Sequence, residues 1–343
     1  MNRSTHVLVT AAAGDLGQAI IKALRLADSP LVIHGCDVAR SSYAAAFVNY
    51  YHCVPLARDP SYVESLDKLT STLGIHAVVP GSEAEILSLG GSPLPSGTPV
   101  VSQPRDSLSV FSDKLSAMEA LRGRVELADF ADGGDPAAVE TLVSAHGYPV
   151  VVKPRLSSGS RGVWIVSSRE ELVAAIARTD MPIVQEYLDD TGGEFSVGVF
   201  RCREFEGAIA FRRKLARTAG LSWEAEVVDD ESVCRYAMRV AQARDITGSV
   251  NVQLRSTMVG PRLLEVNARF SSLAAARALA GFRDVEWAVA LALGESILPG
   301  YHPLRFLRFR RFYHEVVDLG SGFGSVPEWQ PRSVPHPGSR NSD

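Results

Sequence analysis

The chain has 343 residues, of which 46% are hydrophobic and 22% are charged. A protein of this length and composition can bury a large core, which excludes a fully disordered chain, a collagen-like repeat and a disulfide-stapled miniprotein. Lys and Arg number 35 against 39 for Asp and Glu, so the formal net charge is −4. We therefore expect neither nucleic acid nor an anionic membrane as the main partner.

The cysteines and the N-terminal residues favour a reducing compartment. Cys36, Cys53, Cys202 and Cys234 form no CxxC pair, so we expect free thiols. The histidines show no HExxH pattern, which argues against a zinc site. The N-terminus has no basic region followed by a long apolar stretch, so we expect no signal peptide, no membrane span and a cytoplasmic protein.

Short apolar strands alternate with helical patterns over the first third of the chain. Strands are predicted at 6–10, 31–33, 76–80 and 99–101, and helices at 16–26 and 63–73. Such alternation indicates a parallel sheet with right-handed crossovers, and therefore a Rossmann-like domain.

The turn between the first strand and the first helix leaves two interpretations open. The segment from Thr10 to Gly17 resembles the TGxxGxxG turn of short-chain dehydrogenases, with Ala11 in place of the first glycine. Asp37 lies where a ribose-binding acid would be. No tyrosine, however, is followed by Lys four residues later, as that chemistry requires. The sequence favours a tight turn that binds no nucleotide over an NAD(P)-binding oxidoreductase.

The middle of the chain combines two lysines with a flexible loop. Strands are predicted at 148–154, 163–166, 182–188 and 194–200, and helices at 115–121 and 168–177. Lys114 precedes the first of these helices, and Lys153 ends a strand just before a Ser/Gly-rich loop. Backbone N–H groups of such a loop can approach phosphate oxygens, and lysine adds compact charge. Each feature alone is an ordinary turn or strand end; together they favour nucleotide binding.

Further along, residues 249–254 and 262–269 are predicted to form an antiparallel pair of strands. Gln253, Glu265 and Asn267 then share one face, because residues two apart on a strand point the same way. Carboxylate and amide oxygens suit Mg²⁺. Arg269, two residues further on, is placed to stabilise charge on a transferring phosphoryl group. The alternative is the polar outer face of an edge hairpin.

Six segments in this order resemble an ATP-grasp enzyme of the type found in each half of the carbamoyl-phosphate synthetase large chain. They are residues 112–114, 148–154, 157–163, 184–188 with 194–197, 251–253 and 264–269. The resemblance covers about residues 6–320 and implies a mixed α/β and α+β fold. The implied domains are a Rossmann-like pre-ATP-grasp domain at 1–108, a small ATP-grasp subdomain with the phosphate loop at 109–183, and a C-terminal subdomain with the metal site at 184–325. The proline-rich tail at 326–343 is expected to be disordered.

The resemblance also implies which residues bind ATP. The phosphates would contact Lys114 and Lys153. The loop residues closing over them would be Ser158, Gly159, Ser160 and Gly162. The adenine hinge would comprise Glu186, Tyr187 and Leu188, with Glu194 near the ribose.

Metal-binding and catalytic roles follow from the same resemblance. Mg²⁺ would be held by Gln253, Glu265 and Asn267, with glutamine standing where many relatives have glutamate. Arg269 would stabilise the transition state that forms an acyl phosphate. Lys214 belongs to a basic stretch, 212–220, that would face the acceptor site; the alternative for this stretch is a solvated strand and loop.

The implied activity is that of an ATP-dependent carboxylate–amine ligase. It would form an amide or peptide bond through an acyl phosphate, releasing ADP and phosphate, with a small carboxylic acid and an amine, amino acids among them, as partners. A homodimer is implied by the resemblance alone. Three alternatives stay open: transfer of the acyl phosphate to another nucleophile, an NAD(P)-binding oxidoreductase, and a non-catalytic nucleotide-binding module. Carbamoyl phosphate synthesis is not expected, because the sequence has a single grasp unit.

Two C-terminal helices and one basic strand complete the expectations. The helices are predicted at 274–280 and 285–293. Residues 305–311 are predicted to form an edge strand with a basic and an apolar face, with a nucleic-acid site as the alternative.

Overall fold

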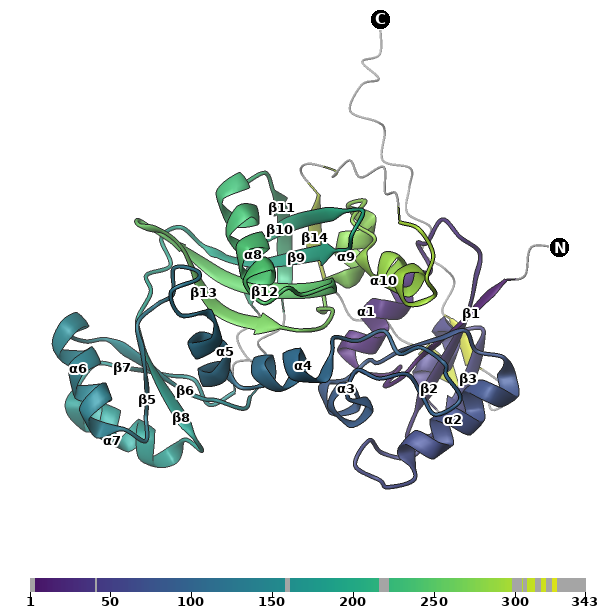
Figure 1. The fold of residues 1–343 in the computed structure, drawn as a ribbon, viewed down its shortest axis with the longest axis horizontal. Coiled ribbons are helices and arrows are strands. Elements are labelled where there is room, and N and C mark those ends of the chain that lie inside the picture. Colours follow the sequence, from purple (N-terminus) through teal and green to yellow (C-terminus); the bar gives the residue numbers. More distant parts are fainter. Residues whose placement is uncertain are drawn as a thin grey trace, which may run out of the picture.

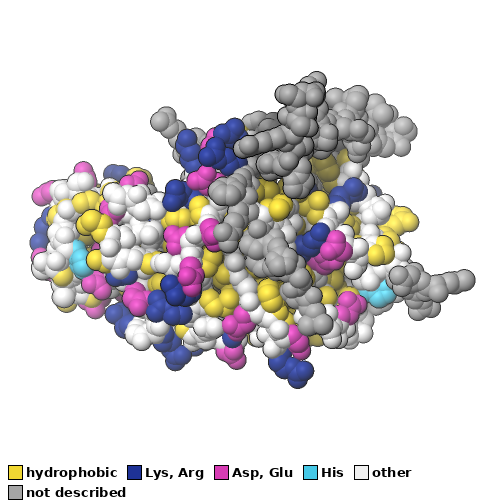
Figure 2. Space-filling view, turned by 90° about the horizontal axis from the view of Figure 1, so that it is seen from above, with side chains coloured by type: hydrophobic (Ala, Val, Ile, Leu, Met, Phe, Trp, Pro, Cys, Tyr) yellow, Lys and Arg dark blue, Asp and Glu magenta, His cyan; other side chains and the backbone are white. Residues whose placement is uncertain are grey.

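Three larger β-sheets of the described residues follow one another along an elongated molecule (Figure 1). The computed structural model describes residues 4–40, 42–157, 161–215, 222–297, 304, 307–311, 316–318 and 323–325. The predicted tail at 326–343 lies outside the described residues. Within the described part, no helix has both the length and the apolar character needed to cross a membrane. Charges of both signs are interspersed on the face shown in Figure 2, in keeping with the nearly balanced composition.

The N-terminal sheet is parallel, as the alternating pattern predicts. Its strand order is β3-β2-β1-β4, with β1 at Thr5–Val9, β2 at Leu31–Asp37, β3 at Tyr50–Cys53 and β4 at Ala77–Val79. Its helices are α1 (Asp15–Leu24), the 3₁₀ turn η1 (Tyr43–Phe47), α2 (Tyr62–Leu73) and α3 (Glu83–Leu89). The strand expected at 99–101 is reduced to one parallel bridge between Val78 and Val100. The chain continues into α4 (Arg105–Ser112) and α5 (Lys114–Leu121).

A small antiparallel sheet forms the opposite end of the molecule (Figure 1). Its order is β5-β8-β6-β7, with β5 at Phe130–Asp132, β6 at Val150–Pro154, β7 at Trp164–Val166 and β8 at Pro182–Glu186. The helices α6 (Pro136–His146) and α7 (Arg169–Arg178) bury residues such as Leu142 and Leu172 with Val150 and Val152 of the sheet. Ser168 caps α7 by accepting from the Glu171 N–H.

The largest sheet has six antiparallel strands in the order β13-β12-β9-β10-β11-β14. The strands are β9 (Glu194–Arg201), β10 (Glu206–Leu215), β11 (Ser222–Val228), β12 (Gly248–Thr257), β13 (Gly260–Asn267) and β14 (Arg308–Arg310). The predicted hairpin is confirmed as β12–β13, with Gln253 opposite Glu265 and Asn251 opposite Asn267. The basic segment 305–311 contributes β14, an edge strand as predicted.

Helices cover both faces of this sheet. The helix α8 (Glu231–Ala243) buries Val233 and Val240 with one face, whereas α9 (Ala274–Leu279) and α10 (Asp284–Ala292) pack on the other. The same two helices contact α1, so the N-terminal sheet shares a core with the large sheet. A further antiparallel pair, β15 (Val316–Asp318) and β16 (Phe323–Ser325), lies beside η1.

The predicted domain boundaries fall inside two elements. The boundary at 108/109 cuts α4, and the boundary at 183/184 cuts β8, a strand that belongs to the small sheet. We propose that the small subdomain extends to the end of β8, because a strand hydrogen-bonded to two neighbours cannot belong to another folding unit.

Candidate active site

A cavity of about 230 Å³ lies where the small sheet meets the large one. Its walls bring together most of the predicted ATP-binding and metal-binding residues: Lys114, Lys153, Glu186, Tyr187, Leu188, Glu194, Gln253 and Glu265. Val151, Val163, Ile165 and Leu264 supply apolar surface between them. Residues separated by up to about half of the chain thus line one pocket, which no local pattern could establish.

Lys153 is the most deeply buried charge of this cavity, with 7% of its surface exposed. Its ammonium donates to the side-chain oxygen of Gln185 at 2.8 Å and to the carbonyl of Leu264 at 3.2 Å. Burial lowers the pKa of Lys153 from 10.5 to about 8, and the nearby carboxylate of Glu265 opposes that shift. An anion that enters the cavity would therefore stabilise the charged form of Lys153.

Lys114 reaches the same place from the first turn of α5. Asp113 caps the helix by accepting from the N–H groups of Leu115 and Ser116, and it also binds the Arg155 side chain. The Lys114 ammonium donates to the carbonyl of Ser157 at 2.6 Å and lies 3.7 Å from a carboxylate oxygen of Glu265. The cap thus holds Lys114 where the predicted phosphate loop begins.

The predicted phosphate loop is described only at its ends. Ser158, Gly159 and Ser160 lie outside the described residues. Gly162 has φ +73°, and a Cβ atom there would lie 2.9 Å from Cγ of Pro154, so this position requires glycine.

The predicted adenine hinge follows β8. Glu186 pairs with Val150 in the sheet, and its carboxylate lies 2.9 Å from Nδ1 of His146. The other nitrogen of His146 is 2.8 Å from Asp129. The carbonyl of Leu188 accepts from Arg255 at 2.7 Å. The carboxylates of Asp129 and Glu186 and the imidazole of His146 lie close enough together to share a metal ion. Both histidine nitrogens, however, already face carboxylates. We therefore interpret the group as an ion-pair network that orients the hinge.

Glu194, Arg213 and Arg255 form an ion-pair network that lines the cavity. Glu194 pairs with Arg213 and Arg255, and Arg213 also donates to the side-chain oxygen of Gln253 at 2.7 Å. Burial opposes ionisation of Glu194, but the two arginines outweigh it and lower the pKa of Glu194 below its usual value. Glu194, predicted to lie near the ribose, is thus held as a carboxylate by two guanidinium groups.

The predicted metal ligands occupy the adjoining face of β12 and β13. Glu265 stands directly opposite Gln253, and Asn267 follows two residues later on the same face. The Gln253 oxygen already accepts from the Arg213 guanidinium, which disfavours a cation beside it. The oxygens of Glu265 and Asn267 therefore fit Mg²⁺ best, and Gln253 fits it less well than the sequence suggests.

Arg269 lies just beyond the end of β13 and lines a small hollow of about 30 Å³ with Ser157, Glu265 and Asn267. One of its nitrogens donates to the carbonyl of Phe270 at 3.0 Å, and another is 3.7 Å from a carboxylate oxygen of Glu83. The structure thus brings Arg269 together with the predicted metal ligands, although Arg269 lies beyond the end of β13.

Lys214 is exposed and lines a different hollow, of about 240 Å³, between β10, β11 and β14. Arg213 lines both this hollow and the main cavity, whereas Lys214 lines only the hollow. Neighbouring residues on β10 point to opposite faces, so the side chain of Lys214 points away from the main cavity. The structure therefore favours Arg213 over the predicted Lys214 as the basic residue of the active site. In the sequence, the alternation of side chains along this strand is the feature that distinguishes Arg213 from Lys214, because it turns them to opposite faces.

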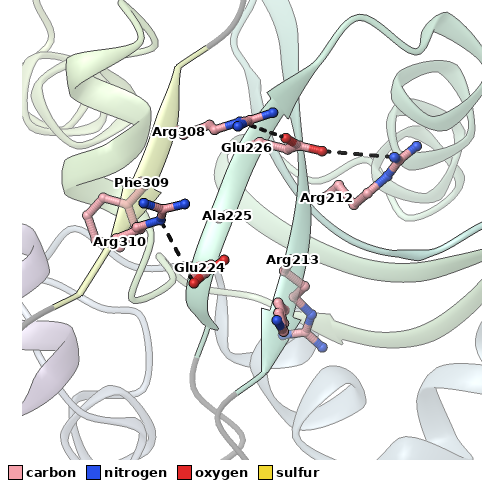
Figure 3. Close-up of a pocket in the computed structure, with 9 residues that line it drawn as sticks. Arg212, Arg213, Glu224, Ala225, Glu226, Arg308, Phe309 and Arg310 are labelled. Carbon is pink, nitrogen blue, oxygen red and sulfur yellow. Dashed lines mark ion pairs between the residues drawn. The ribbon is translucent and has the colours of Figure 1, made fainter.

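The hollow beside Lys214 is not a uniformly basic surface. Glu226 lies between Arg308 and Arg212 at 3.3 and 3.9 Å, and Glu224 lies 3.8 Å from Arg310 (Figure 3). Among the described residues of this hollow, the acids of β11 lie beside the arginines of β10 and β14 and partly neutralise their charge.

The turn after β1 is held by contacts with other residues of the N-terminal domain. The N–H of Ala13 donates to the Asp37 carboxylate at 2.9 Å, so the acid expected at a ribose holds the turn instead. A Cβ atom at Gly17 would lie 2.2 Å from the carbonyl oxygen of Ala11, so the helix packs directly on the turn. This geometry supports the interpretation of a tight structural turn.

Comparison with known proteins agrees with this architecture. Residues 178–306 match a family described as "ATP-grasp in the biosynthetic pathway with Ter operon". The biotin carboxylase domain of 2-oxoglutarate carboxylase from Hydrogenobacter thermophilus, solved with MgADP, ADP and bicarbonate, superimposes with a TM-score of 0.67 at 14% identity, over 89% of this chain and 73% of that one. The chain therefore has a fold of the ATP-grasp type, preceded by a Rossmann-like parallel sheet.

Two curated relatives are similar in sequence. The D-alanine–D-alanine ligase of Thermotoga sp. (strain RQ2) is 36% identical over 98 residues, which are 27% of this chain and 30% of the ligase. The phosphoribosylamine–glycine ligase of Streptomyces coelicolor is 25% identical over 292 residues, which are 76% of this chain and 70% of that enzyme. The chain thus matches less than a third of the length of the first relative.

Proposed function

We propose that this protein is an ATP-dependent carboxylate–amine ligase that works through an acyl phosphate. The observation that carries the proposal is the convergence of Lys114, Lys153, Glu265, Asn267 and Arg269 on two adjoining hollows. The two relatives named above are ligases that join a carboxylate to an amine, which supports the same reaction class. ATP and Mg²⁺ are the proposed cofactor pair, in keeping with the MgADP of the structural neighbour.

The protein would contribute position and charge. The lysines and Arg213 line one cavity and would lie near the phosphates of ATP, where positive charge stabilises oxygens that become more negative during transfer. Glu265 and Asn267 would hold Mg²⁺, which supplies further positive charge to the phosphates. Arg269, on the far side of Glu265, would orient the acid so that its oxygen faces the γ-phosphate.

The chemistry balances in two steps. A carboxylate oxygen bonds to the γ-phosphorus while the bond between that phosphorus and the β,γ-bridging oxygen breaks, and ADP leaves with the electron pair. The amine nitrogen then bonds to the acyl carbon, phosphate leaves with its oxygen, and the nitrogen loses a proton to solvent or phosphate. The acyl phosphate needs exclusion of water, which the buried position of Lys153 favours.

The nature of the released nucleotide tests the proposal. We expect ADP and never AMP, because in this proposal the charged residues would surround the terminal phosphates. Nucleotide chromatography after incubation with ATP, Mg²⁺ and a panel of acids measures this, and hydroxylamine in place of the amine should yield a hydroxamate. AMP, or binding of NAD(P)H without binding of ATP, would contradict the proposal. ADP without a hydroxamate would show that no acyl phosphate forms and would contradict it too.

A further inference from the structure

Three of the eight histidines lie together on one face of the N-terminal sheet. His6 lies on β1, His34 on β2 and His52 on β3. In the strand register Leu8 stands beside His34 and Cys36 stands beside His52, so all three rings share one face. This face packs against α2, and the proposed reaction uses none of these histidines.

The three rings form a continuous hydrogen-bonded row, which we call the histidine chain. Nδ1 of His6 lies 3.1 Å from Nε2 of His34, and Nδ1 of His34 lies 3.0 Å from Nε2 of His52. The planes of the last two rings differ by 14°, and their centroids are 5.3 Å apart. The rings therefore meet edge to edge through their nitrogens, and both nitrogens of His34 are engaged.

The histidine chain can accept one extra proton but not three. An N–H···N hydrogen bond needs one protonated and one unprotonated nitrogen. A neutral row meets this condition at both contacts, and so does a row in which His34 alone is charged. When two neighbouring rings are both charged, two N–H groups face each other across about 3 Å and repel. The paired strands thus resist protons that the same histidines would bind in an open segment.

Burial adds to this resistance at the centre of the row. His34 is 3% exposed. Burial, followed by the positive charges that His52 and His6 would carry, lowers the pKa of His34 from 6.5 to about 4. Burial also lowers the pKa of His52. Both directions agree with the repulsion expected from the ring contacts.

The groups around the histidine chain bring no compensating negative charge. Among the described residues, no carboxylate is a cause of the shifts at the two buried rings. His76, before β4, has its ring 5.8 Å from the first ring of the row, and Tyr50 of β3 stacks on the central one. From α2 comes Tyr62, whose pKa burial raises, so it is uncharged. The acid Glu85 accepts from Thr10, just beyond the other end of β1.

The strand β3 depends most directly on these contacts. It is an edge strand of four residues, and its ladder partner in the sheet is β2. Two of its side chains, Tyr50 and His52, contact His34 across that ladder. Repulsion between His34 and His52 therefore acts on the pairing of β3 with β2.

We propose that the histidine chain is a pH-sensitive latch, which keeps β3 paired with β2 at neutral pH and releases it in mildly acidic solution. The open strand binds more protons than the paired one between about pH 4 and pH 6.5. The pairing is therefore strongest above about pH 6.5 and weakens as the pH falls toward 4. This inference is independent of the proposed function.

Hydrogen–deuterium exchange of the full chain at pH 7.5 and pH 5 tests the latch. After correction for the intrinsic exchange rates, the amides of β3 should exchange about tenfold to thirtyfold faster at pH 5, whereas those of β6 in the small sheet should not change. Equal protection of β3 at both pH values would overturn the proposal. Equal loss of protection in β3 and β6 would show global unfolding and would overturn it as well.

Substitutions separate titration from packing. His52→Gln keeps a neutral amide toward His34 and cannot become charged, so β3 should stay protected at pH 5 as at pH 7.5. His146→Gln removes a histidine outside the row and is the matched control, for which the acid release of β3 should persist. Release of β3 at pH 5 but not at pH 7.5 in His52→Gln would refute the role of the row.

A direct titration decides the question if His52→Gln leaves β3 unprotected at both pH values. Nuclear magnetic resonance of the wild-type chain with ¹³C-labelled histidine follows each ring, with signals assigned from the single variants. We expect the signal of His34 to remain that of an uncharged ring at pH 5.5, and the three rings together to take up fewer than three protons before β3 opens. Ordinary, independent titration of all three rings near pH 6.5 would overturn the proposal.

Discussion

At the scale of single residues, burial decides how the charges of the cavity behave. Lys153 is enclosed by the small sheet and by β13, and its pKa is lowered from 10.5 to about 8 because burial disfavours the ammonium. In the unliganded protein, the unfolded chain binds more protons than the folded one between these two values. The free energy of unfolding therefore gains a contribution that grows as pH rises from about 8 to 10.5.

Binding of ATP should show the opposite dependence. We expect the affinity for ATP to fall as pH rises above about 8, by up to tenfold per pH unit, since Lys153 then loses the proton that attracts phosphate. Lys153→Met, which keeps the bulk, should bind ATP roughly tenfold to a hundredfold more weakly and lose this pH dependence. Calorimetric titrations across pH check both, with circular dichroism as the folding control. An unchanged affinity in Lys153→Met would refute the role of the lysine.

The metal face offers a second prediction at this scale. Glu265→Gln should raise the Mg²⁺ concentration needed for activity far more than Gln253→Ala does, because Glu265 brings formal charge whereas the Gln253 oxygen faces Arg213. Titrations of Mg²⁺ in ADP-release assays, and of Mn²⁺ binding by electron paramagnetic resonance, compare the two variants. If Gln253→Ala is the more damaging, the glutamine is a ligand and Arg213 moves away when the metal binds.

At the scale of elements, one helix start aligns the active site. The N-terminus of α5 is held to the end of β6 by Asp113, which caps the helix and binds Arg155, and by the N–H of Lys114, which donates to the carbonyl of Arg155. Two elements from different segments are thus joined at the residues that precede the phosphate loop. The position of Lys114 is a consequence of this junction.

Asp113→Ala should therefore lower the free energy of unfolding by more than the loss of an ordinary helix cap does. Loss of the cap costs about 1 kcal/mol, and loss of the partly exposed bond to Arg155 adds about the same, so we expect about 2 kcal/mol lower free energy of unfolding. Asp135→Ala is the matched control: Asp135 caps α6 through Ala137 and Ala138, and about 1 kcal/mol is expected. Urea denaturation measures both. Equal losses in the two variants would show that the Arg155 bond adds nothing.

At the scale of the whole molecule, a buried ion pair joins the helices α9 and α10 to the large sheet. Arg277 and Asp284 are 1% and 0% exposed and lie 3.1 Å apart, and Ser249 of β12 donates to Asp284 at 2.6 Å. Burial raises the pKa of Asp284, and the guanidinium of Arg277 opposes this shift. Because these helices also contact α1, the pair lies beside the junction with the N-terminal sheet.

Removal of one partner should destabilise the entire protein. Asp284→Ala leaves the Arg277 charge buried and unpaired, for which we expect a loss of about 3–5 kcal/mol in the free energy of unfolding. Ser249→Ala removes one hydrogen bond to Asp284 and should lose about 1 kcal/mol, which keeps the test informative if the first variant does not fold. Glu231→Ala, which breaks an exposed pair on α8, should change stability by less than about 0.5 kcal/mol. A small effect of Asp284→Ala would contradict this account.

Local sequence patterns were sufficient for much of the fold. The alternation of apolar runs and helical spacing predicted the parallel sheet, and the spacing of Gln253, Glu265 and Asn267 predicted one shared face, because both depend on periodicities of the backbone itself. Among the elements not predicted are the helices α3, α4, α6 and α8 and the strands β3 and β5. The strands are only three or four residues long, so their patterns are weak. The helix α8, in contrast, buries Val233, Tyr236, Ala237, Val240 and Ala241, a helical spacing that the sequence contains.

Tertiary structure alone decided which charges meet. Arg213 and Lys214 are adjacent and both basic, yet Arg213 lines the cavity because the register of β10 against β9 turns it toward Glu194. Likewise Asp37, which suggested a ribose site, instead closes a turn. A separate cavity beside Arg269 combines residues from six segments of the chain. By itself the sequence determined many of the elements and the residue types of the candidate site, since these follow from local spacing. Long-range strand pairing and burial determined which residues became neighbours and how burial shifts their pKa values.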